Sequence, residues 1–180
     1  MSEHGRDASE APRLPAEDAG GPVGTGPREL AVMRAGGRVF AVYADEADSV
    51  TEGLRPTPLP GAPPAVLGVV CVRGRMRTVL DPLALFGDTH HATRDATPPT
   101  PPRFVVALRG DEQLALAVER VERIVEAPPD ALRPPADDQH TAAPLRGLVI
   151  LDDTPVAVLD PARLFDAAMQ GTERRRPRTP

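Results

Sequence analysis

Two stretches of the sequence repeat the same residues at the same spacing, and this duplication constrains the fold more than any other feature. Residues 68–87 align with residues 147–166 without a gap. Eight positions are identical: Gly68/Gly147, Val70/Val149, Val79/Val158, Leu80/Leu159, Asp81/Asp160, Pro82/Pro161, Leu85/Leu164 and Phe86/Phe165. A gapless repeat of this kind indicates two copies of one structural unit.

Each copy has the pattern of a β-hairpin followed by a capped helix. In the first copy, an apolar run reaches a turn at Arg73-Gly74, returns through Val79 and stops at Asp81-Pro82. An aspartate at this place can accept bonds from the free N–H groups of the following helix, and proline suits its first turn. Positions shared by both copies therefore belong to the scaffold. We expect the Leu-Phe pairs 85–86 and 164–165 to close one open end of each sheet.

The remaining apolar runs are short and paired, which favours a mainly β fold. Gly36-Gly37 permits a tight hairpin turn, and aromatic residues are few. Two copies of about five strands with irregular connections predict an all-β protein of two tandem closed barrels with short helices. The predicted organisation is a disordered N-terminal arm (1–28), a folded region (29–170) that comprises a first barrel (29–87), a proline-rich connection (88–102) and a second barrel (103–170), and a disordered basic C-terminal tail (171–180).

Composition excludes several classes of function. The net charge of -5 argues against general nucleic-acid binding, which needs a basic face. Cys71 is the only cysteine, so an intrachain disulfide and a thiolate metal cluster are excluded. Because Cys71 occupies the repeat position of Ile150, we expect it to be a buried apolar filler. The sequence has no signal-peptide pattern and no membrane-length apolar run, which predicts a cytoplasmic protein.

The residues offer little for catalysis or metal binding. Serine occurs only at Ser2, Ser9 and Ser49, too few for a Ser-His-Asp hydrolase. Potential metal ligands fall in irregular connections, at His90-His91 and at Asp137-Asp138 with His140. No glycine-rich phosphate loop follows a strand at the required spacing. We therefore predict no catalytic residue, no metal and no cofactor.

The two hairpins differ most at their tips. Residues 73–77 read Arg-Gly-Arg-Met-Arg, whereas residues 152–156 read Asp-Asp-Thr-Pro-Val. Along a strand, Arg75 and Arg77 share one face and Met76 takes the other. Because scaffold requirements are common to both copies, the arginine-bearing tip is a candidate functional site. The alternative is that both tips are solvated loops.

Residues 59–87, LPGAPPAVLGVVCVRGRMRTVLDPLALFG, resemble the signature of CheW-like domains: a proline-rich approach, Gly-Val, an Arg-Gly turn, a return strand and Asp before a short helix. The resemblance extends from about Glu29 to Met169. It implies a pair of five-stranded, SH3-like barrels without a catalytic site. Family members are adaptors in two-component signalling that join chemoreceptor tips to a CheA-type histidine kinase. The kinase carries a related domain that packs barrel to barrel, and the receptor tip docks near the groove between the adaptor's two barrels.

The resemblance also implies site residues. The receptor-binding set is Arg73, Gly74, Gly68, Arg75 and Arg77. The kinase-binding set, from the family's Val-x-Glu-hydrophobic strand, is Val50, Glu52 and Leu54, with Gly53 standing where the family has an apolar residue. Further departures are Cys71 for Asn, Thr78 for Pro and Pro82 for Leu. The implied location is the cytoplasm, with recruitment to membrane-associated receptor arrays.

We therefore expect an adaptor in chemotaxis, and two alternatives remain open. The first is a solitary CheW-like domain that serves another motility or gene-control kinase. The second, from a different class, is a small all-β ligand-binding domain or enzyme. A pocket with converging polar side chains would support the latter, and an exposed apolar barrel end would support the adaptor.

Overall fold

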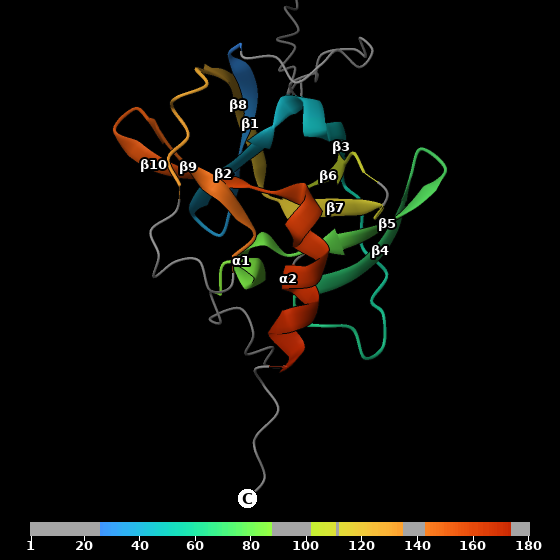
Figure 1. The fold of residues 1–180 in the computed structure, drawn as a ribbon. Helices are drawn as coiled ribbons and strands as arrows, with labels where there is room; N and C mark the ends of the chain where they lie inside the picture. The colour runs from blue at the N-terminus through green and yellow to red at the C-terminus, as the bar shows by residue number, and fades with distance from the viewer. Residues whose placement is uncertain (1–25, 88–101, 111, 135–142, 174–180) are drawn as a thin grey trace, which may run out of the picture.

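The computed structural model describes residues 26–87, 102–110, 112–134 and 143–173, and these residues form a mainly β fold (Figure 1). The strands are β1 (Arg28–Ala35), β2 (Arg38–Tyr43), β3 (Ala47–Glu52), β4 (Val66–Val72), β5 (Arg75–Leu80), β6 (Phe104–Leu108), β7 (Leu114–Val118), β8 (Arg120–Ala127), β9 (Leu145–Leu151) and β10 (Thr154–Leu159). The helical segments are a 3-10 turn η1 (Ala44–Glu46), α1 (Pro82–Leu85) and α2 (Pro161–Glu173). The predicted all-β class with few helices is confirmed.

The strands make two five-stranded sheets, in the orders β8-β1-β2-β10-β9 and β3-β6-β7-β5-β4. The predicted number of strands per unit is confirmed. The predicted assignment of residues 29–87 to one barrel and 103–170 to the other is wrong, because each sheet takes strands from both halves. The chain crosses between the sheets after each half's first hairpin, through η1 after β2 and between β7 and β8. The two halves are therefore intertwined.

Strand register shows that the two sheets are copies of one arrangement. In β4–β5, Gly68 lies opposite Val79; in β9–β10, Gly147 lies opposite Val158. Both hairpins shift register next to this pair. The returning strand then pairs in parallel with the second strand of the other half, β5 with β7 and β10 with β2. The repeated sequence therefore forms the same pattern of strand pairing twice.

A crossing chain explains the glycine that both copies share. Thr57 and Val69 exchange two backbone hydrogen bonds of 2.8 and 2.9 Å over Gly68, and Arg133 and Leu148 exchange two of 2.8 Å beside Gly147. A Cβ on either glycine would collide with the carbonyl oxygen of the crossing residue. Gly68 also has a φ of +144°, a conformation that side chains disfavour.

The core has three apolar clusters. The largest joins both sheets to both helices, and its fully buried side chains include Phe40, Leu80, Leu108, Leu116, Leu159 and Leu164. A second cluster lies in the sheet of β1 and a third in the sheet of β4. Burial of this apolar surface is the main stabilising term.

The predicted packing of the Leu-Phe pairs in the helices after the hairpins holds for some of these residues and fails for one. Leu85 and Leu164 are buried, and the Phe86 ring lies 5.9 Å from that of Phe40. Phe165 is 43% exposed, so its predicted role in closing a sheet is wrong. In α2 the inward face carries Leu164 and, one turn later, Ala168, which leaves Phe165 on the solvent side.

The ends of the folded part differ slightly from the predicted bounds. β1 already begins at Arg28, and α2 continues to Glu173, past the predicted start of the tail at 171. Residues 1–25 of the predicted arm, residues 174–180 of the tail and residues 88–101 of the connection lie outside the described residues. His90-His91 and Asp137-Asp138 with His140 lie there too.

Candidate protein-interaction site

The tips of the two equivalent hairpins have the same backbone conformation. Arg73 and Gly74 have φ values of 49° and 77°, and Asp152 and Asp153 have 47° and 61°. Positive φ at both central residues is the geometry of a tight two-residue hairpin turn. The tips project from opposite sides of the molecule, at the outer ends of β4–β5 and β9–β10 (Figure 1). They therefore differ in side-chain chemistry and not in backbone shape.

Arg73 and Arg75 are accessible at the first tip. Both side chains are exposed, and within the described residues neither forms an ion pair. Met76 beside them is 58% exposed. The tip thus presents two unpaired guanidinium groups and one apolar side chain to solvent.

Arg77 does not belong to this accessible cluster, and the expectation that it does is wrong. The residue is 4% exposed. Its Nη1 donates to the carbonyl oxygen of Leu108 at 2.6 Å, and its Nη2 lies 3.0 Å from an oxygen of Asp48. Arg75 and Arg77 do share a face, but it is the inner face, which also carries Val79. Only the tip, where Arg75 lies, extends beyond the covered part of the sheet.

Cys71 is exposed, so its predicted role as a buried filler is wrong. It lies on the outer face of the hairpin, directly opposite Met76. The equivalent Ile150 is 47% exposed and lies opposite Pro155. Cys71 and Ile150 therefore occupy equivalent positions, as the repeat indicates, and both positions lie on the surface.

The predicted kinase-binding residues lie on and just after β3, at one edge of the second sheet. Val50 is half-buried against the main core, and Leu54 packs against the core of its own sheet. Glu52 is exposed, with Arg103 at 3.4 Å. Gly53 ends the strand at a φ of +75° with open space around it, and its N–H donates to the Arg103 carbonyl.

A charged network that the sequence analysis missed joins η1 to β9 and to the start of α2. Arg146 lies 2.7 Å from Glu46 and 3.0 Å from Asp160. Burial raises the pKa of Glu46, although Arg146 opposes this effect. Burial lowers the pKa of Arg146, but the hydrogen bond and charge of Glu46, together with Asp160, outweigh it and the pKa is raised. No spacing in the sequence marks this group, because Glu46 and Arg146 are 100 residues apart.

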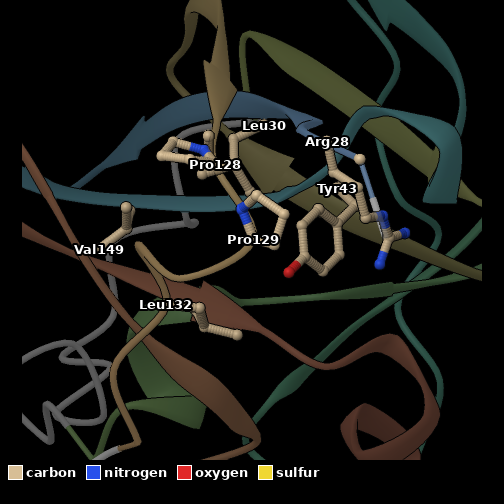
Figure 2. A pocket seen from close by; sticks show the side chains of 9 residues that line it. Arg28, Leu30, Tyr43, Pro128, Pro129, Leu132 and Val149 are labelled. Atoms are coloured by element: carbon tan, nitrogen blue, oxygen red, sulfur yellow. The ribbon is translucent and has the colours of Figure 1, made fainter. Parts of the chain in front are cut away.

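Hollows in the described part of the molecule include one between the sheets and one at a sheet end. One of about 400 Å³ lies between the sheets and includes Glu46, Arg109 and Arg146 in its lining. Its two arginines are used within the fold, since Arg146 is held as above and Arg109 donates to the Ala47 carbonyl. The other, of about 140 Å³, is a mainly apolar opening at the end of the first sheet, where Tyr43 and Leu132 face a pair of prolines (Figure 2).

None of the helices in the described ranges has the length and apolar character needed to cross a bilayer.

Comparison with known proteins gives one consistent result. The family model described as "CheW-like domain" matches residues 29–169. Among solved structures, the chain is similar to the scaffolding protein TtCheW from Thermoanaerobacter tengcongensis, with a TM-score of 0.65 and 17% sequence identity. The similarity covers 78% of this chain and 93% of that one. No match was found among curated proteins.

Proposed function

Because the chain belongs to the CheW-like domain family, we propose that it acts as a non-enzymatic adaptor in chemotaxis signalling. In this role it couples methyl-accepting chemoreceptors to a CheA-type histidine kinase by binding alone. The observation that carries the proposal is the basic tip, which occurs on only one of two hairpins of the same backbone geometry. The chain acts in the cytoplasm and is recruited to membrane-associated receptor arrays.

The receptor contact is formed by the tip of the β4–β5 hairpin. Arg73 is exposed and unpaired among the described residues, so its planar guanidinium can bind a receptor carboxylate through two parallel hydrogen bonds. Gly74 keeps the turn tight, and Arg75 adds a second charge beside it. Gly68 and Arg77 act indirectly. Gly68 leaves room for the crossing chain, and buried Arg77 anchors β5 by donating to the Leu108 carbonyl.

The kinase contact is formed by β3 and the residues after it. Among the described residues Glu52 pairs only with exposed Arg103, at 3.4 Å, and such surface pairs contribute little energy. Glu52 can therefore exchange this partner for a charged group of the kinase's related domain. Val50 and Leu54 supply the half-buried apolar surface on either side of it. Since β3 and β4 are the outermost strands of one sheet, the two contacts lie at opposite edges of that sheet.

Co-sedimentation of the purified chain with receptor-containing membranes and kinase tests the proposal. Arg73→Glu is expected to lose receptor binding and to keep kinase binding, whereas Glu52→Lys is expected to do the reverse. Arg120→Glu, on the exposed side of β8, is the matched control and should bind both. Normal co-sedimentation of Arg73→Glu with receptors would contradict the assignment. Capture of an unrelated kinase in place of a CheA-type kinase would assign the adaptor to another pathway.

A further inference from the structure

We propose that Arg77 is a positioning residue for the kinase contact. It holds a β-bulge at the start of β3 and thereby fixes how this strand presents Val50 and Glu52. The inference rests on the proposed function, because it concerns the kinase contact at β3. It gives Arg77 a role at the edge of the sheet opposite to β4.

Arg77 contacts both strands at the bulge. The pairing of β3 with β6 shifts between Ala47 and Ser49, so Asp48 is an extra residue with no residue opposite it. The Nη2 of Arg77 lies 3.0 Å from a carboxylate oxygen of Asp48. The Nη1 donates at 2.6 Å to the carbonyl oxygen of Leu108 in β6. One guanidinium group therefore binds the extra residue and also the strand that faces it.

The side chain of Arg77 reaches these groups from a distant strand. In the sheet, β7 lies between β5 and β6, so the side chain extends past β7 on the inner face. Arg77 is 4% exposed, and its Nε has no hydrogen-bond partner among the described residues. Burial of a charged group with an unsatisfied donor costs free energy, which offsets much of what its contacts contribute. Stability alone is therefore a weak reason for an arginine at this position.

The other sheet forms an equivalent bulge without a buried arginine. The pairing of β8 with β1 also shifts once, and the extra residue in β8 is Glu122. Its carboxylate lies 2.6 Å from Arg34 on the neighbouring strand β1, and both side chains are partly exposed. The position equivalent to Arg77 is Val156, which is 2% exposed. The fold therefore accepts an apolar side chain at this position, and the buried arginine is a property of one sheet only.

The bulge determines which face of the sheet each later residue of β3 occupies. Side chains alternate between the two faces of a strand, so closing the bulge would move every later side chain to the other face. Val50, which packs against the main core, and exposed Glu52 both follow Asp48 in the strand. As an outermost strand, β3 is paired with β6 alone in the described sheet. Arg77 holds the bulge from a third strand, and this keeps Glu52 available to the kinase.

Kinase binding and hydrogen exchange of the full-length chain test this inference. The double variant Arg77→Met, Asp48→Ala removes both charges and should still fold, since apolar Val156 occupies the equivalent position. Its dissociation constant for a CheA-type kinase should rise about tenfold, the change expected if only roughly a tenth of the molecules keep the binding register. Amides of β3 should exchange at least about tenfold faster, while amides of the equivalent strand β8 keep their rates.

Two control variants separate positioning from general stability. Val158→Ala removes buried methyl groups from the other sheet, so it should lower stability and bind kinase like the wild type. Asp48→Glu keeps the carboxylate, and the equivalent bulge already contains a glutamate at Glu122. This conservative variant should therefore retain the kinase affinity that the double variant loses.

A double variant that folds and binds kinase like the wild type would overturn the inference, and so would unchanged exchange of the β3 amides. An equal loss of affinity in Val158→Ala would also overturn it, since reduced stability would then explain the effect. These results leave the adaptor proposal intact. A wild type that binds no CheA-type kinase would contradict the adaptor proposal as well, so the two failures are distinguishable.

Discussion

Replacing Gly68 by alanine tests whether this glycine belongs to the scaffold. An added Cβ would meet the carbonyl oxygen of Thr57, which is backbone and cannot swing aside. The variant must therefore lose the two hydrogen bonds between Thr57 and Val69, at about 1 kcal/mol each. The φ of +144° adds strain of about 1–3 kcal/mol for a residue with a side chain. We expect Gly68→Ala to lower the free energy of unfolding by roughly 3 kcal/mol.

Urea unfolding followed by circular dichroism measures this loss. For a domain of this size, the corresponding decrease in Tm is about 6–12 °C. Gly26→Ala is the matched control, because its Cβ would meet nothing within 4 Å and its φ is ordinary. It should leave stability unchanged or raise it by up to about 1 kcal/mol. If Gly68→Ala unfolds at the same urea concentration as Gly26→Ala, the argument from the crossing chain is refuted.

Three further substitutions test other parts of the structure. Arg77→Ala leaves the Asp48 carboxylate without its partner and should cost about 3 kcal/mol in urea unfolding; an unchanged midpoint would mean that Arg77 is not held inside. Asp160→Ala removes the acceptor at the start of α2 and should cost about 1 kcal/mol, and an unchanged melting curve would contradict the capping role. Because burial raises the pKa of Glu46, the folded state holds this proton more tightly than the unfolded chain, and stability is lost as the pH rises through the folded pKa. Glu46→Gln should therefore melt above the wild type at neutral pH and approach it in acid; a lower Tm at neutral pH would contradict the sign.

Local structure was predictable from the sequence because it depends on neighbouring residues. The β4–β5 and β9–β10 hairpins and the Asp-Pro starts of α1 and α2 follow from turn and cap chemistry within a few positions. The exchange of strands between halves was not predictable in this way. A duplicated pattern is the same whether each half folds alone or contributes strands to both sheets. In the structure, the short segment η1 carries the chain from one sheet to the other, so each half contributes strands to both sheets.

In the candidate site, too, the features that depend on neighbouring residues were predictable, and those that depend on distant residues were not. Alternation along β5 correctly placed Arg75 and Arg77 on one face but could not tell that this face is covered. The partner that compensates the burial of Arg77 is Asp48, 29 residues earlier in the chain. Cys71 was misplaced for the converse reason, since an apolar residue at its repeat position indicates similarity of environment and not burial.

Exchanging the turn residues of one hairpin for those of the other tests the central claim most directly. The double variant Arg73→Asp, Gly74→Asp gives the first tip the turn of the second, whose aspartates already adopt φ values of 47° and 61°. The fold should therefore be preserved, with a Tm close to that of the wild type, while binding to receptor-containing membranes is lost. A variant that folds normally and still binds receptors would contradict the claim that function lies in the chemistry of this tip.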